Sequence, residues 1–150
     1  MHDVKSVDGT EWFYTEIVKE HFFNPQNILK TKDEEEVYNK EASGIGEVGS
    51  PACGDVMKMW IKIKDNKISE CKWRTFGCAS AIAATSMFST MIIGMTIEEA
   101  LNVKPKDIAD NLGGLPMRKF HCSVLADQSF KAAIKDYKEN QWVWIDLIAS

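Results

Sequence analysis

Alternation of hydrophobic and polar residues dominates the middle of the chain and predicts a β-hairpin. In the stretch 55–64 it places the apolar residues 57, 59, 61 and 63 on one side of a strand, with lysines and Trp60 on the other. Asp65-Asn66 supplies turn chemistry, and a second strand follows with Cys71 and Trp73 on the presumed inner side and Ile68 on the outer side. The glycine-spaced segment 44–49 is expected to add a third strand, because an isolated hairpin is only marginally stable.

Apolar residues recur at helical spacing before and after this sheet, so we expect helices there. The stretches 11–23 and 79–97, and a segment from about Ser123 onward, have apolar stripes of helical period. The first helix should end before Asn24-Pro25, and short helices should follow Thr96 and Lys104. These elements predict an α+β fold, in which a small antiparallel three-stranded sheet has helices packed on one face.

Two segments require a choice between alternatives. The stretch 79–97 has no charged residue and approaches the about 20 residues that span a bilayer, but Met87 and Met91 share one face while Ser86 and Ser89 lie on the other. We therefore expect a buried helix and no membrane association. The charge-dense segment 31–43 is interpreted as a solvated surface segment, with an acidic docking patch for a basic partner as the alternative.

Length and composition narrow the class of protein further. The chain has 150 residues, 45% of them hydrophobic, which predicts a single domain over 1–150 with a real core. Its 18 basic residues against 22 acidic ones give a net charge of −4, which disfavours binding to nucleic acid. No apolar run follows Met1, so we expect no signal peptide, a cytoplasmic location and reduced thiols.

Three of the four cysteines stand where predicted elements begin or end. Cys53 lies in a Pro- and Gly-containing turn two residues before Asp55, and Cys78 separates the second strand from the uncharged helix. Cys122 stands at the start of the last helix, just after Lys119 and His121. Helix starts and neighbouring positive groups stabilise thiolates, so we expect a thiolate to be favoured at Cys78 and the pKa of Cys122 to be lowered.

The cysteines and nearby polar residues form a plausible metal site, but their spacing alone does not prove one. There is no Cys-x-x-Cys pair, and ordinary core thiols remain the alternative. Disulfides are a weaker alternative, because small disulfide scaffolds are denser in cysteine. We assign Cys71 to core packing and His21 to a hydrogen bond at a helix surface or in a loop.

Four ordered segments carry a family resemblance. They are 21–27, 49–55, 75–83 and 119–126, which contain His-Phe-Phe-Asn-Pro-Gln-Asn, Gly-Ser-Pro-Ala-Cys-Gly-Asp, Thr-Phe-Gly-Cys-Ala-Ser-Ala-Ile-Ala and Lys-Phe-His-Cys-Ser-Val-Leu-Ala. Over roughly 12–137 the chain resembles the IscU/NifU-type iron–sulfur cluster scaffold family. Residues 140–150 lie outside the resemblance, and we expect them to form an apolar C-terminal extension that packs on the core or on a partner.

The resemblance implies a scaffold or carrier rather than an enzyme. A [2Fe–2S] cluster would be assembled from iron and from sulfur supplied by a cysteine desulfurase, then transferred to apo iron–sulfur recipient proteins. An iron or electron donor is a further partner that it implies. By resemblance, the cluster-ligand or sulfur-accepting cysteines are Cys53, Cys78 and Cys122, the nearby carboxylate is Asp55, and the charged neighbours of the last cysteine are Lys119 and His121. We expect Cys122 to accept the persulfide sulfur, assisted by Lys119 and His121.

One segment departs from the family pattern, and other functions remain open. Leu115-Pro116-Met117-Arg118-Lys119 stands where many relatives have Leu-Pro-Pro-Val-Lys, the segment that a specialised chaperone recognises, so docking of that chaperone is in doubt. A zinc-binding sulfur carrier is the alternative function, with Zn²⁺ at Cys53, Asp55, Cys78 and Cys122. A zinc deaminase or hydrolase is disfavoured, because the chain has no His-x-Glu with Pro-Cys-x-x-Cys.

Overall fold

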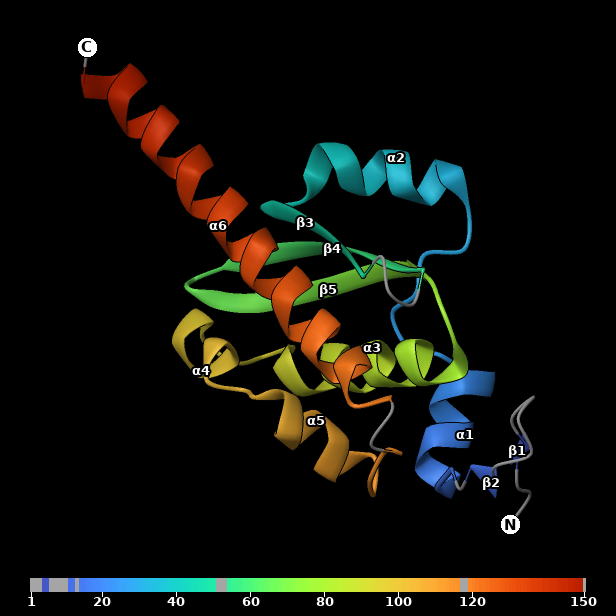
Figure 1. Ribbon diagram of the computed structural model, residues 1–150. Coiled ribbons are helices and arrows are strands. Elements are labelled where there is room, and N and C mark those ends of the chain that lie inside the picture. The colour runs from blue at the N-terminus through green and yellow to red at the C-terminus, as the bar shows by residue number, and fades with distance from the viewer. Residues whose placement is uncertain (1–3, 6–10, 13, 51–53, 117–118, 150) are drawn as a thin grey trace.

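The computed structural model of the chain describes residues 4–5, 11–12, 14–50, 54–116 and 119–149. A short antiparallel pair, β1 (Val4–Lys5) and β2 (Glu11–Trp12), precedes the main body (Figure 1). The remaining elements follow in this order: α1 (Glu16–Phe23), α2 (Lys32–Glu41), β3 (Gly44–Ser50), β4 (Asp55–Lys64), β5 (Lys67–Phe76), α3 (Ala79–Ile92), α4 (Ile97–Leu101), α5 (Pro105–Asn111) and α6 (His121–Ala149).

The main sheet confirms the predicted three antiparallel strands, in the order β3-β4-β5. Asp65 and Asn66 form the hairpin turn with positive φ angles of 53° and 62°, as a type I′ turn requires. A register shift near Lys62 pairs Ile63 with Ile68 and leaves Ser69 as an extra residue. The prediction that Ile68 faces outward is therefore wrong, because this bulge returns its side chain to the core, where it is buried.

Helices α3 and α6 cover the inner face of the sheet. The core between them contains Phe88 and Phe130, whose ring centroids lie 5.5 Å apart. Strand β3 packs directly on the backbone of α6, because Cβ atoms added to Gly44 and Gly46 would lie 2.1 and 2.2 Å from carbonyl oxygens of that helix. Only glycine fits at these two positions, which fixes α6 against β3.

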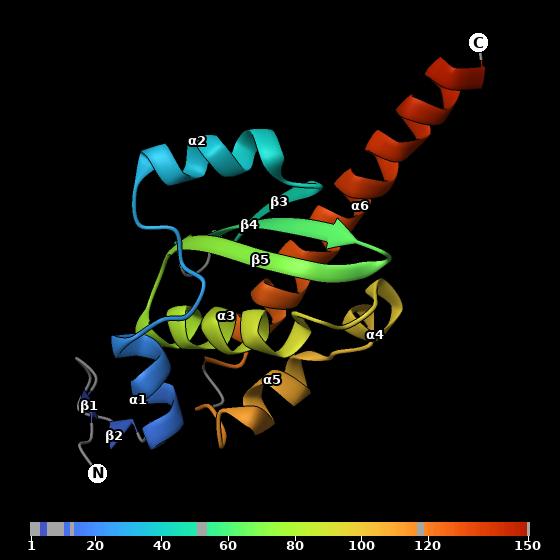
Figure 2. The same ribbon diagram turned by 180° about the vertical axis from the view of Figure 1, so that it is seen from behind.

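Helix α2 lies on the outer face of the sheet (Figure 2), where the sequence predicted a solvated segment. Thr31 caps the helix by accepting a hydrogen bond from the Glu34 N–H. Although no residue of α2 is buried, Trp60 beneath it is, and the Trp60 indole N–H donates to the Asn39 side chain at 2.7 Å. The outward alternation of Trp60 was predicted correctly, but its burial by α2 was not.

Several helix boundaries differ from the predicted ones. Helix α1 begins at Glu16 instead of 11, because Thr15 is its N-cap and residues 11–12 belong to β2. Helix α3 ends at Ile92, before Gly94, which adopts a φ of +92°. The short helices after Thr96 and Lys104 are confirmed, and the first of them has a full capping box.

The last helix is long and leaves the body of the molecule. Helix α6 has 29 residues and begins at His121, two residues before the predicted start. Both views show its C-terminal end projecting away from the sheet and the other helices (Figures 1 and 2). Within the described part of the chain, no helix is long and apolar enough to cross a membrane. The packing of the apolar extension 140–150 stays a prediction.

Candidate functional site

The ends of three elements bring together residues that are distant in the sequence. Asp55 is the first residue of β4, and Cys78 follows β5 as the N-cap of α3. His121 and Cys122 open α6. The antiparallel register pairs Val56 with Phe76, so the start of β4 and the end of β5 lie side by side, and α3 and α6 pack together beneath them.

Sulfur, nitrogen and oxygen atoms of these residues surround one point. The Sγ atoms of Cys78 and Cys122 lie 3.8 Å apart, and Cys122 Sγ lies 3.6 Å from His121 Nε2. The same His121 nitrogen lies 3.5 Å from Asp55 Oδ2. Donor atoms of Asp55, His121 and Cys122 all fall within 4.8 Å of one another, which suits a metal ion with mixed ligands.

The carboxylate of Asp55 is held in a buried position. Its side chain is 4% exposed, and among the described residues Oδ2 has no hydrogen-bond partner. The other oxygen lies against Gly77, since a Cβ there would be 2.9 Å from Asp55 Oδ1. The His121 nitrogen at 3.5 Å compensates this burial only in part. A buried carboxylate oxygen without a hydrogen bond is costly, and a bound cation would offset that cost. The residues present therefore fit an iron or zinc ion.

The two thiols of the site share a hydrogen bond that separates their acidities. The Cys122 S–H, donated to the Cys78 sulfur, lowers the pKa of Cys78 to about 5, against the opposing effect of burial. The Ala81 backbone N–H and the Lys119 charge add to this lowering. The pKa of Cys122 is raised, by the same hydrogen bond, by burial and by repulsion from the Cys78 thiolate.

The predicted lowering of the Cys122 pKa is therefore wrong. The positive charge of Lys119 does favour a Cys122 thiolate, but this is the smallest of the effects on the Cys122 pKa. The pKa of Lys119 is itself raised, because the two sulfurs nearby outweigh the opposing effect of burial. One thiolate at Cys78 and one thiol at Cys122 are thus the stable arrangement of the pair without metal.

Two further residues singled out in the sequence, Cys71 and His21, lie away from the site. Cys71 is fully buried and its pKa is raised to about 12 by burial, which confirms its assignment to packing. His21 Nδ1 lies 2.7 Å from Ser86 Oγ, which confirms the predicted hydrogen bond. Cys53 lies outside the described residues, as do Met117 and Arg118, on which the predicted change in chaperone docking depends. These two predictions stay open.

Two supports of the site were not predicted from the sequence. One is Gly77, which directly precedes Cys78 and leaves room for the Asp55 carboxylate. The other is a buried hydrogen bond in which Ser80 Oγ donates to the Tyr14 hydroxyl at 3.1 Å, tying the first turn of α3 to the segment before α1. A small residue beside a candidate ligand could have indicated the first, whereas no local pattern indicates the second.

Comparison with known proteins places the chain in a family. The model of the NifU-like N terminal domain matches residues 13–143. The chain belongs to the NifU-like N-terminal domain family. The match contains Cys53, Asp55, Cys78, His121 and Cys122, so every ligand candidate lies within the family domain.

Relatives of this NifU-like domain include named assembly scaffolds. The chain is 48% identical over 124 residues to iron–sulfur cluster assembly scaffold protein IscU 1 of Archaeoglobus fulgidus. The aligned region covers 83% of this chain and 76% of the relative. It is 44% identical over 129 residues to the scaffold protein IscU of Escherichia coli K12, covering 85% of this chain and 96% of the relative.

A solved structure supports the fold. The crystal structure of a scaffold protein for the SUF system from Fervidobacterium islandicum AW-1 superposes with a TM-score of 0.58 over 80% of this chain and 95% of that chain. At 22% identity this similarity bears on the fold alone. It agrees with the α+β fold predicted from the sequence, with a three-stranded antiparallel sheet and packed helices.

Proposed function

We propose that Asp55, Cys78, His121 and Cys122, together with Cys53, hold a [2Fe–2S] cluster while it is assembled and until it is transferred to an apo-protein. The broader function follows from the family: the chain is an iron–sulfur cluster assembly scaffold and not an enzyme. The observation that carries the assignment of the site is the 3.8 Å approach of two sulfurs beside a buried carboxylate oxygen that has no hydrogen bond from any described residue and lies 3.5 Å from the His121 nitrogen.

The mixed donor set suits a cargo that must leave again. Thiolates are the preferred ligands of iron in sulfide clusters, whereas the oxygen of Asp55 and the nitrogen of His121 are harder donors. A hard ligand should exchange more readily than a fourth thiolate. We therefore assign to Asp55 the role of a ligand that is released when a recipient thiolate replaces it.

Sulfur delivery is proposed to run through Cys122. A Cys122 thiolate would attack the terminal sulfur of a persulfide on a cysteine desulfurase; the donor S–S bond would break, and the donor cysteine would leave as a thiolate. Because the resting thiolate belongs to Cys78, the proton of Cys122 must first move to Cys78, along the 3.8 Å contact between the sulfurs. Lys119 and His121 are proposed to stabilise the negative charge during this exchange.

The low pKa of Cys78 makes it the competitor for the role of acceptor. Cys122 is fully buried, whereas Cys78 is partly exposed. Replacing Cys122 by Ser should abolish the desulfurase-dependent persulfide on this chain if Cys122 is the acceptor. An unchanged persulfide yield in that variant, with loss in Cys78→Ser, would transfer the role to Cys78.

A zinc-binding sulfur carrier is the second candidate function. The cluster of oxygen, nitrogen and sulfur donors at Asp55, His121 and Cys122 favours it, because Zn²⁺ accepts all three kinds of ligand. Zinc could also occupy the protein as isolated without being its cellular cargo. The two functions differ in what the site does with iron and sulfide.

Anaerobic reconstitution separates these functions. The chain is incubated with a cysteine desulfurase, cysteine, Fe²⁺ and dithiothreitol, which reduces the persulfide sulfur to sulfide, and is then mixed with an apo-[2Fe–2S] ferredoxin. We expect visible charge-transfer bands, iron and acid-labile sulfide in equal amounts, and transfer to the ferredoxin. Colourless zinc protein that relays only sulfur would contradict the scaffold. Cys71→Ala is the matched control, because it removes a buried thiol outside the site and should assemble the cluster normally.

A further inference from the structure

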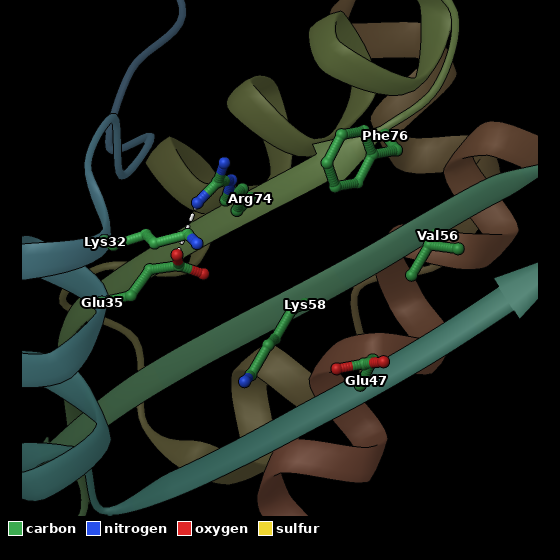
Figure 3. A pocket seen from close by; sticks show the side chains of 7 residues that line it. All are labelled: Lys32, Glu35, Glu47, Val56, Lys58, Arg74 and Phe76. Carbon is green, nitrogen blue, oxygen red and sulfur yellow. Dashed lines mark hydrogen bonds and ion pairs between the residues drawn. The ribbon is translucent and has the colours of Figure 1, made fainter.

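The outer face of the sheet has an open hollow next to the candidate site (Figure 3). Helix α2 covers this face around Trp60 and Lys62, through contacts from Asn39 and Glu41. It leaves uncovered the end where β4 begins and β5 ends. The hollow there has a free volume of about 350 Å³ and is lined by residues from α2 and all three strands.

The floor of the hollow is apolar and exposed. Val56 and Phe76 lie directly opposite each other on β4 and β5, with 40% and 69% of their surfaces exposed. Val56 directly follows Asp55, and Phe76 precedes Cys78 by two residues. The two side chains therefore stand at the end of the sheet that carries the candidate site, and a protein that covers them would be stabilised in the complex through apolar burial.

The rim of the hollow has more positive than negative charge, unlike the chain as a whole. Three cations, Lys32, Lys58 and Arg74, face two carboxylates, Glu35 and Glu47. Arg74 and Glu35 form an ion pair, drawn in Figure 3. Lys58 Nζ lies 5.0 Å from the ring of Trp60, and within the described residues neither Lys58 nor Lys32 has an ion pair. The whole chain has a net charge of −4.

We infer that this hollow is the docking surface for the apo iron–sulfur protein that receives the cluster, and that the recipient binds with an acidic segment containing an apolar side chain. The inference rests on the proposed function. A recipient must bring thiolates to a site that already contains a thiolate and a carboxylate, within a negatively charged chain. Repulsion opposes that approach, and the cations of this rim are placed beside the site to offset it.

The test measures the rate of cluster transfer to an apo-[2Fe–2S] ferredoxin by stopped flow at low salt. We expect Lys58→Glu and Lys32→Glu each to lower the second-order rate about tenfold, with the difference falling to about twofold near 0.5 M salt. Lys32 is the first residue of α2, where an acidic residue favours the helix, so its variant should fold normally. Val56→Ser should slow transfer at every salt concentration.

Matched controls and separate readouts decide the outcome. Lys138→Glu makes the same charge change at an exposed position of α6, and Val37→Ser removes an exposed apolar side chain of α2; both should transfer at the wild-type rate. All variants should assemble normal amounts of iron and sulfide. Normal assembly with no difference between Lys58→Glu and Lys138→Glu would overturn the docking surface alone. A wild-type dimer that Lys58→Glu dissociates would show a second copy to be the occupant. A wild-type chain that assembles no cluster would contradict the proposed function itself.

Discussion

Gly77 lies in direct contact with the carboxylate of Asp55, so that a Cβ at position 77 would be 2.9 Å from Asp55 Oδ1. The residue before Cys78 therefore decides where the buried carboxylate can lie. Gly77 is a positioning residue, because it touches the proposed ligand and not the cargo.

Gly77→Ala should displace Asp55 and weaken metal binding. The added methyl group also meets Ala81 Cβ at 3.1 Å, so Asp55 or the start of α3 must move. We expect the affinity for zinc, measured by competition with a chelating dye, to fall at least tenfold. Gly49→Ala is the control, since its Cβ would meet only ordinary contacts beyond 3.4 Å. Zinc affinity within twofold of wild type in Gly77→Ala would refute this role.

Asp55→Ala should impair the scaffold with little net change in the stability of the metal-free protein. The substitution removes the desolvation cost of a buried carboxylate, about 1–3 kcal/mol, but it also removes the contact with His121 and leaves a cavity. The free energy of unfolding in urea should therefore differ from that of wild type by less than about 1 kcal/mol. Cluster transfer from this variant, and from Asp55→Cys, should be slower than wild type. Transfer rates at or above wild type would exclude a role for Asp55 in release.

Thiol reactivity should depend on pH in a way that distinguishes the two cysteines. With its pKa lowered to about 5, Cys78 should react with iodoacetamide half-maximally near that pH, while Cys122 stays protected at neutral pH. Peptide mapping by mass spectrometry measures both. Cys122→Ala removes the donated hydrogen bond, so the Cys78 profile should move upward toward the ordinary range of a thiol. An unshifted profile would show that another group stabilises the thiolate.

The lowered pKa of Cys78 also predicts how the stability of the fold depends on pH. Because the pKa of Cys78 is lower in the folded chain than in an unfolded one, its thiolate stabilises the fold above the ordinary thiol pKa of about 9, and this contribution is lost as pH falls toward 5. The difference in unfolding free energy between wild type and Cys78→Ala should therefore shrink across that range on acidification. A difference that does not depend on pH would count against the shift.

Mild oxidation should join the two sulfurs of the site. Cys78 Sγ lies 3.8 Å from Cys122 Sγ, so closure to a disulfide of about 2 Å requires only a small movement. Treatment of the metal-free chain with diamide should lower the number of titratable thiols by two and give a cross-linked peptide that contains both residues. Cys71 should remain unreacted because it is fully buried. Prior loading with zinc should protect the pair, and equal oxidation with and without zinc would contradict its coordination by these sulfurs.

The sequence predicted the elements better than their contacts. The hairpin, the third strand, the uncharged helix and the short capped helices depend on local signals such as alternation, turn residues and caps, and they are present. The bulge at Ser69 and the packing of α2 over Trp60 depend on contacts between distant segments, which a local pattern does not contain. The helix within the charge-dense segment 31–43 was not predicted, because it is stabilised by an N-cap and by ion pairs to the sheet.

The candidate site shows the same division. The position of Cys78 and Cys122 at helix starts was predictable from the sequence, and so was the proximity of Asp55 through the family motif. The order of the two thiol acidities was not, because it arises from a contact between residues 44 positions apart in the chain. Proximity in the sequence alone suggested that Lys119 and His121 would lower the pKa of Cys122.

Helix α6 is unbroken from Cys122 to Ala149, a length of roughly 40 Å. Its first half is held by the backbone contacts at Gly44 and Gly46 and by buried side chains such as Leu125 and Phe130. A sideways load on the protruding end would therefore be taken up by this anchored half. The geometry of the sulfurs is thus mechanically insulated from forces at the far end of the helix.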